Sequence, residues 1–194
     1  LDAGTPVAGQ PPHHVTDGFR NAPQPASAEL FDLVLDRIRL ALLPNPAAVA
    51  KPAARTSREA RAAWDALGDT KPDAVVWIGH ATVLVRVGGK TILTDPVFGD
   101  YATPVPPFGP RRLVPPGIAL DDLPRIDAIV VSHDHYDHFE PDSIRRIARR
   151  DRPLCLLPLN VGGRADFGCA RTERLDWGGV ARLAGVTLRF VPSQ

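Results

Sequence analysis

The fold of this chain is decided by residues 127–138, which read DAIVVSHDHYDH. Residues 127–132 form a short apolar run with β-branched residues at its centre, which predicts a buried strand. Four side chains that can bind a metal ion come directly after this run: His133, His135, Asp137 and His138. The sequence therefore predicts a strand whose end leads into a cluster of metal ligands.

The cluster has the chemistry of a site for divalent metal ions. Imidazole nitrogen and carboxylate oxygen suit zinc, with iron and manganese as the alternatives. Neighbouring side chains on one loop cannot all face a single ion, so two ions are expected, each held by two of the four residues. The competing interpretation, a solvated His/Asp loop before the next helix, leaves unexplained why three of the chain's six histidines gather here.

The composition is that of a globular protein and excludes some functions. Of 194 residues, 44% are hydrophobic and 23% are charged, which is typical of a chain that folds around a core. The formal net charge of +1 gives no support to nucleic-acid binding, and no apolar run is long enough for a transmembrane helix. Cys155 and Cys169 form no Cys-x-x-Cys motif, and we interpret them as ordinary small residues rather than as a pair.

Three regions follow from the distribution of proline, glycine and apolar residues. Residues 1–26 are rich in Pro, Gly and Ala and are predicted to form an extended N-terminal arm. Residues 27–70 are predicted to be a helical segment, with helices at about 27–43 and 57–67, because apolar residues recur there at helical spacing. From residue 71 to residue 194 the pattern changes to the short apolar runs that are typical of a sheet.

This last region is predicted to be a mixed α/β domain. Strands are expected at residues 74–79, 82–87, 90–95, 127–132, 153–157 and 186–191, with a helix at 141–150. The Gly88-Gly89 pair is typical of a tight hairpin between the second and third strands. The loop at 96–124 is long and rich in proline, which is typical of a functional or a disordered segment. Whether its aromatic residues line an acyl-chain pocket is left open.

Several blocks of the sequence resemble one known family. The pattern His133-x-His135-x-Asp137-His138 after an apolar strand resembles the signature of the metallo-β-lactamase superfamily. The blocks WIGHAT (77–82), LTDPVF (93–98), FGPRR (108–112) and LDW (175–177) resemble its N-acyl-phosphatidylethanolamine-hydrolysing phospholipase D branch and bacterial relatives of that branch. The resemblance implies an αββα sandwich with two zinc ions at one edge, of which residues 71–194 would be the N-terminal half.

The resemblance also assigns the metal ligands. His133 and His135 would bind the first ion, and Asp137 and His138 the second, with Asp137 and His138 also taking part in catalysis. The family adds a third histidine, a bridging aspartate and a final histidine further along, and these have no counterpart before Gln194. We therefore expect a chain that is truncated at its C-terminus.

Two further residues are candidates for supporting roles. Asp95 ends a predicted strand, where a carboxylate can orient a ligand histidine or a water molecule; its alternative is a cap of the turn before Pro96. His80 also lies at a strand end. Three roles are open for His80. It could support the metal ligands, contact the substrate, or be a core histidine whose hydrogen bonds are satisfied.

The expected function is hydrolysis of a phosphodiester in a phospholipid, such as an N-acyl phosphatidylethanolamine. A hydroxide made available near neutral pH by two divalent ions would attack phosphorus. Within enzymes the alternative is another ester, such as a lactone or a small phosphodiester. The alternative from another class is an inactive fragment that acts as a binding or interaction module and needs its missing half or a second chain.

The sequence does not specify the compartment. The chain begins at Leu1 and contains no Met, so an upstream signal or anchor would lie outside it. A bacterial protein in the cytoplasm or at a membrane is favoured, and a peripheral membrane contact is an open alternative. The physiological substrate, the metal and the oligomeric state are equally left open.

Overall fold

The computed structural model describes residues 5–16, 18–19, 56–68, 72–103, 105–107 and 109–192. The chain divides into two compact units, residues 1–52 with 192–194 and residues 53–191. In the first unit, His14–Val15 (β1) and Gly18–Phe19 (β2) pair as a short antiparallel hairpin. The helix predicted at residues 27–43 lies outside the described residues, and the predicted domain boundaries stay a prediction.

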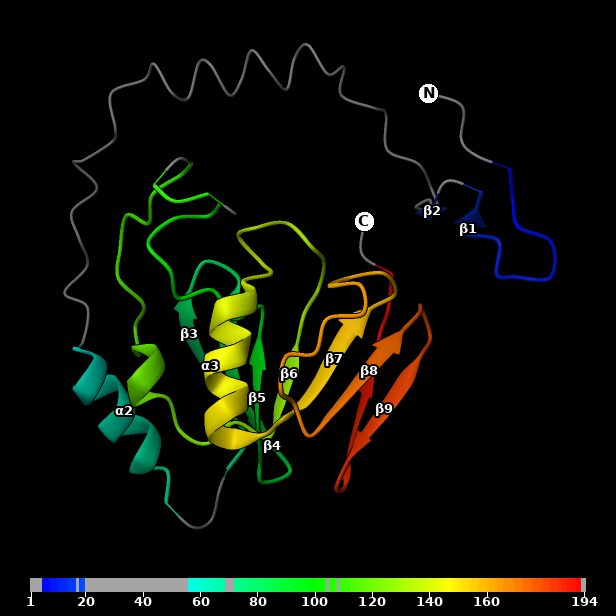
Figure 1. Ribbon diagram of the computed structural model, residues 1–194. Coiled ribbons are helices and arrows are strands. Elements are labelled where there is room, and N and C mark those ends of the chain that lie inside the picture. Colours follow the sequence, from blue (N-terminus) through cyan, green and yellow to red (C-terminus); the bar gives the residue numbers. More distant parts are fainter. Residues whose placement is uncertain are drawn as a thin grey trace. The chain divides into compact units, whose positions relative to one another are not determined.

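The second unit is built on a six-stranded mixed sheet (Figure 1). Its strands, in spatial order, are Ala74–Gly79 (β3), Thr82–Val87 (β4), Lys90–Thr94 (β5), Ala128–Val130 (β6), Leu154–Pro158 (β7) and Arg171–Leu175 (β8). Strands β3 to β5 are antiparallel neighbours, and β5 to β8 are parallel. Because β3 therefore runs in the same direction as β5, both strands end at the edge where β6 and β7 end.

One face of this sheet is covered by two helices, Ser57–Asp65 (α2) and Pro141–Asp151 (α3). Every second residue of the strands points into this layer, as the period-two pattern requires. The layer buries Leu84, Leu93, Ile129, Cys155 and Leu157 of the sheet with Trp64, Ile144 and Ile147 of the helices. Burial on this scale, at about 25 cal/mol per Å² of apolar surface, is the main stabilising contribution to the sheet–helix packing.

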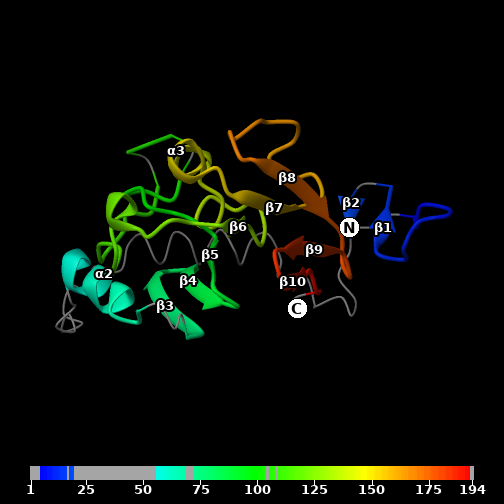
Figure 2. The same ribbon diagram turned by 90° about the horizontal axis from the view of Figure 1, so that it is seen from below.

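The opposite face of the sheet carries a second antiparallel hairpin, Val180–Leu183 (β9) with Val186–Arg189 (β10). Figure 2 shows this hairpin and α3 on opposite sides of the sheet. The alternate residues of the strands are buried here against Ala181 and Val186: Ile92, Ala128, Leu154 and Leu156. Burial of both faces explains why β6 and β7 read as continuous apolar runs in the sequence.

Both helices begin where the sequence provides a start signal. Thr56 caps α2, and its side chain and that of Glu59 bond reciprocally to each other's backbone amides in a capping box. Pro141 is the first residue of α3, where its missing N–H costs nothing. The buried residues Ile144 and Ile147 of α3 lie on one face of this helix, at helical spacing.

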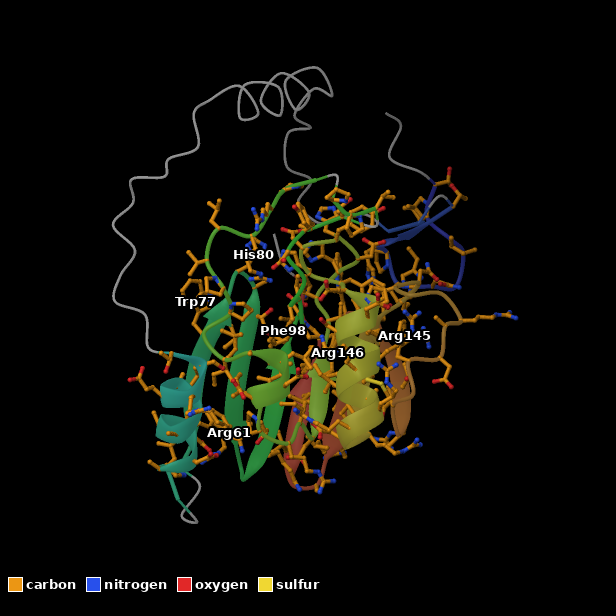
Figure 3. All side chains as sticks on the ribbon, turned by 60° about the vertical axis from the view of Figure 1, so that its left-hand side comes forward. Arg61, Trp77, His80, Phe98, Arg145 and Arg146 are labelled. Carbon is orange, nitrogen blue, oxygen red and sulfur yellow. A yellow bond between two sulfur atoms is a disulfide. The ribbon has the colours of Figure 1, made fainter. Side chains whose placement is uncertain are left out.

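Helix α3 carries a run of arginines, Arg145, Arg146, Arg149 and Arg150, of which Figure 3 labels the first two. Arg145 lies 2.9 Å from Asp142 and Arg146 lies 2.8 Å from Asp121. These exposed ion pairs add little stability, and they partly neutralise the charge of the arginine run. None of the described helices has both the length and the apolar character that crossing a bilayer requires.

The interpretation of the two cysteines as unpaired is wrong. Cys155 in β7 and Cys169 before β8 form a disulfide, with their Cα atoms 6.1 Å apart, which lies within the span that such a bond requires. The parallel pairing of β7 with β8 brings the two residues together, since Cys155 lies opposite Thr172 in the register. The sequence pattern could not reveal this because β8 was not predicted as a strand.

Four of the observed strands were missed by the sequence analysis: β8 and β9 in this unit, and the short β1 and β2 in the predicted N-terminal arm. The residues of β8 read RTERL, with charged side chains at Arg171, Glu173 and Arg174. Charged residues therefore lie on both faces of the strand, and the apolar alternation that would predict a strand is missing. This strand is held by its parallel ladder to β7 and by its place beside the hairpin rather than by its own pattern. The long loop predicted at 96–124 is present, with a short 3-10 helix, Leu120–Asp122 (η1), near its end.

Candidate metal centre

The candidate metal ligands gather at one edge of the sheet, where three strands end. Strand β6 leads into the segment that carries His133 to His138, β5 ends next to Asp95, and β3 ends next to His80. Figure 3 shows His80 at the end of the β3–β4 pair. The topology of the sheet thus brings together residues that are far apart in the sequence.

Asp95 is the buried anchor of this edge, with only 5% of its surface exposed. Its carboxylate accepts hydrogen bonds from Ser132 N at 2.7 Å and from Ser132 Oγ at 2.8 Å. Its backbone has a positive φ of 39°, which a residue other than glycine adopts only when its surroundings hold it there. The Thr82 hydroxyl provides that support, because it donates to the Asp95 carbonyl at 2.6 Å and accepts from Val97 N at 3.2 Å.

The same carboxylate orients His138. Asp95 Oδ2 lies 2.9 Å from His138 Nδ1, and because a carboxylate accepts, this ring nitrogen carries the proton. His138 Nε2 is then left with a lone pair, and it lies 3.7 Å from Asp137 Oδ2. This is the arrangement in which a second group fixes the tautomer and the direction of a ligand histidine. The supporting role proposed for Asp95 thus has a direct geometric basis.

His80 contacts the other carboxylate of the cluster. Its Nε2 lies 2.7 Å from Asp137 Oδ2, and its ring meets that of His138 edge-on at a centroid distance of 5.4 Å. Ligand atoms of His80, Asp137 and His138 all lie within 4.8 Å of one another. Among the options left open for His80, the core histidine is wrong, since its side chain is 54% exposed and faces the cluster.

The predicted first pair of ligands, His133 and His135, stands beside this group. Their ring centroids are 4.6 Å apart, and the His133 ring lies 4.0 Å from that of His138. The pKa of His133 is lowered from its ordinary value of 6.5, mainly because burial disfavours the charged ring and then because His138 and His135 repel it. A neutral imidazole is the form that binds a metal, so the donor set fits divalent ions.

The carboxyl of Asp137 is held in its ionised form. Burial raises its pKa, but the hydrogen bond with His80, its own backbone amide and the charges of His138 and His80 together outweigh burial, so that the pKa lies below 3.8. Only an ionised carboxylate binds a metal strongly, and Asp137 is ionised at any physiological pH. The pKa values of His133 and Asp137 are therefore both shifted toward the protonation states that metal binding requires.

The lowered pKa of His133 predicts how the stability of the metal-free protein depends on pH. Because the unfolded chain takes up a proton at His133 more readily than the folded chain does, His133 favours the folded state above pH 6.5, and this contribution is lost as the pH falls. We expect the free energy of unfolding, measured with urea in the presence of a chelator, to decrease between pH 7.5 and about pH 5.5. His133→Asn should flatten that decrease, and an unchanged slope in this variant would contradict the assignment.

The structure adds supporting residues that the sequence analysis did not single out. Ser132 bridges Asp95 to His133, with its Oγ 2.9 Å from His133 Nδ1. Glu140, just before α3, accepts hydrogen bonds from Phe98 N at 2.8 Å and from Gly99 N at 3.1 Å. Ser132 directly precedes His133 in the sequence, so its position next to the candidate ligands was a signal, whereas nothing in the sequence pointed to Glu140.

The start of the loop after Asp95 is held by Glu140 before α3 and by Arg112, which lies further along the same loop. Besides the Glu140 contact, Arg112 donates to the carbonyl of Val97 at 2.7 Å and to that of Gly99 at 3.1 Å. Phe98, labelled in Figure 3, packs against the apolar layer under the helices. Its ring therefore contributes to the core. Pro104 and Phe108, two other residues of this loop, lie outside the described residues.

Comparison with known proteins places this architecture in a family. A family model described as "Beta-lactamase superfamily domain" matches residues 90–194, which is more than half of the chain. An uncharacterized protein of Mycobacterium tuberculosis is 40% identical over 130 residues, covering 66% of this chain and 35% of that protein.

Two further relatives carry names that describe an activity. N-acyl-phosphatidylethanolamine-hydrolyzing phospholipase D 1 of Caenorhabditis elegans is 44% identical over 110 residues, covering 53% of this chain and 31% of that protein. A metal-dependent hydrolase of Rubrobacter xylanophilus is 34% identical over 122 residues, covering 62% of this chain and 43% of that protein. The chain spans about a third of the length of the first curated relatives that it matches.

The family match, the mixed sheet and the His/Asp segment after β6 agree with one another. They confirm the predicted resemblance and the predicted fold class. The chain belongs to the beta-lactamase superfamily.

Proposed function

We propose that this chain provides the metal-binding edge of a hydrolase that cleaves a phosphodiester of an N-acyl phosphatidylethanolamine-like phospholipid. The observation that carries the proposal is the convergence of His133, His135, Asp137 and His138 at one sheet edge, with Asp95 behind His138. The 44% sequence identity with the Caenorhabditis elegans phospholipase over 110 residues supports the choice of substrate class. Zinc is the favoured ion, because imidazole and carboxylate are its usual ligands in hydrolytic sites.

Each residue of the edge has a defined task in this proposal. Two bound ions would supply a water of lowered pKa and offset the negative charge that develops on phosphoryl oxygens. His133 and His135 would hold one ion, while Asp137 and His138 would hold the other. Asp95 keeps the proton of His138 on Nδ1, and Ser132 fixes the position of Asp95. The rigid end of β6 limits how far these ligands can drift apart.

A substrate panel tests the proposal. Metal-reconstituted protein would be assayed on vesicles that contain N-acyl phosphatidylethanolamine, on a chromogenic phosphodiester and on a lactone, with chelated protein as the control. We expect metal-dependent release of the phospholipid head group as an N-acylethanolamine. Hydrolysis of lactones alone, or no phosphodiester hydrolysis by protein that holds its metal, would overturn the proposal.

A further inference from the structure

We infer that Ser132 is a positioning residue for the first ion of the proposed site, because its hydroxyl sets the tautomer of His133. The inference rests on the proposed function and deepens it, since it connects one ligand of each ion to a single carboxylate, that of Asp95. Ser132 lies between the end of β6 and His133 in the chain. Its side chain contacts groups that belong to both pairs of candidate ligands.

The Ser132 hydroxyl lies among three polar atoms of the sheet edge. Its Oγ is 2.8 Å from Asp95 Oδ2 and 2.9 Å from His133 Nδ1. His138 Nδ1 is further from this hydroxyl, at 3.3 Å, and lies closer to Asp95 Oδ2, at 2.9 Å. The backbone amide of Ser132 donates to the other oxygen of the same carboxylate, Asp95 Oδ1, at 2.7 Å. Short contacts therefore fix both the hydroxyl and the carboxylate.

The number of protons in this network gives the direction of each hydrogen bond. A serine hydroxyl has one proton to donate, whereas a carboxylate only accepts. The proton of Ser132 therefore points to Asp95 Oδ2, and the contact with His133 forms only if the imidazole donates. His133 then carries its proton on Nδ1 and has a lone pair on Nε2. Burial, which is the main reason for the lowered pKa of His133, favours the neutral ring that this arrangement needs.

One carboxylate thus serves both pairs of candidate ligands. Asp95 Oδ2 holds His138 directly, and it holds His133 through the Ser132 hydroxyl. Each of these two histidines presents Nε2, the nitrogen without a proton, for metal binding. A supporting hydrogen bond fixes the tautomer and the orientation of a ligand histidine. Ser132 would provide this support for the first ion, and Asp95 would provide it directly for the second.

The competing role for Ser132 is to hold Asp95 in place without any effect on His133. The two roles predict losses at different ions. If the hydroxyl served Asp95 alone, its removal would weaken the second ion, which depends on Asp95 through His138. If the hydroxyl sets His133, its removal weakens the first ion. The second ion is then nearly unaffected, because the backbone amide of Ser132 still holds the carboxylate.

The first experiment is a zinc titration of the full chain against a chromophoric chelator. The first ion is identified as the zinc equivalent that Asp137→Asn retains. We expect Ser132→Ala to weaken that equivalent 10- to 100-fold, which is the usual loss for a supporting group, and to change the affinity for the other by less than about threefold. Ser132→Thr, which keeps a hydroxyl, should recover most of the lost affinity.

The second experiment observes the tautomer of His133 by 15N NMR of the metal-free protein. The spectra would be recorded at about pH 8, where an ordinary histidine is neutral, and the His133 signals are those that disappear in His133→Asn. We expect the proton on Nδ1 in the unaltered chain and in Ser132→Thr. In Ser132→Ala we expect it to be distributed over Nδ1 and Nε2. A role confined to Asp95 would leave the tautomer the same in all three proteins.

The matched control is Ser57→Ala, which removes a hydroxyl that also contacts an aspartate, Asp122, but lies at the start of α2. It should bind both zinc equivalents as the unaltered protein does. Three results would overturn the inference and leave the proposed function standing: a proton on His133 Nε2 in the unaltered chain, equal or greater weakening of the second equivalent in Ser132→Ala, or a loss of less than about tenfold at the first. A chain that binds no zinc at all would overturn both.

Discussion

Replacing Asp137 with asparagine is expected to lower kcat/KM for phosphodiester hydrolysis roughly a thousand-fold. The amide is a weak metal ligand, so the second ion would be lost or loosely held. A metal ion contributes several kcal/mol of charge stabilisation in such a transition state, and about 4 kcal/mol corresponds to that factor in rate. The measurement is steady-state hydrolysis at saturating metal, together with the metal content of the dialysed protein.

The matched control for Asp137→Asn is Asp134→Asn, which makes the same chemical change at an exposed position of the same loop. Its rate and metal content should stay within about twofold of those of the unaltered protein. Since asparagine is close to aspartate in size, the fold should be preserved, and circular dichroism would verify this. A fully active Asp137→Asn protein would show that this carboxylate has no part in metal binding or catalysis.

Replacing Asp95 with asparagine is expected to damage both metal binding and stability. An amide nitrogen cannot accept the hydrogen bonds that Asp95 now accepts from Ser132 and His138. Loss of such a support typically costs 10- to 100-fold in metal affinity. Because Asp95 is buried, unpaired polar groups would remain in the interior, and the free energy of unfolding should decrease by about 1–3 kcal/mol. Zinc titration and urea unfolding of the metal-free protein measure the two effects.

Asp100→Asn is the control for Asp95→Asn, because Asp100 is an exposed carboxylate in the loop that follows. It should change neither the metal affinity nor the unfolding midpoint. An Asp95→Asn protein with unchanged affinity but reduced stability would show that Asp95 supports the sheet edge without orienting His138. Unchanged stability together with unchanged affinity would contradict the described hydrogen-bond network altogether.

The sheet was predictable wherever side-chain alternation decides the burial of a strand. Strand β4 reads TVLVRV, and its buried and half-buried residues alternate as the pattern requires. Strand β8 failed this test because its sequence, RTERL, has no apolar alternation and depends on its partners. The disulfide between Cys155 and Cys169 also depends on the pairing of β7 with β8. No pattern of neighbouring residues could predict it.

The candidate ligands could be singled out from the sequence because four of them are neighbours in it. The spacing H-x-H-x-D-H marks these residues in the sequence, and the structure brings them to one edge of the sheet: His133, His135, Asp137 and His138. The groups that orient them come from other strands, so only a three-dimensional structure connects Thr82 to Asp95. The supporting role of Asp95 was predicted from its place at a strand end and has a hydrogen-bond partner in His138.

The Glu140 contact bears on how a substrate would reach the metal-binding edge. Glu140 joins the start of α3 to the backbone amides of Phe98 and Gly99, and it also accepts from the Ser143 hydroxyl within α3. The segment next to Asp95 is thus tied to a helix that is itself anchored in the core. We expect these contacts to hold this part of the rim in one conformation, so that in the proposed hydrolase a substrate would pass a surface of fixed shape.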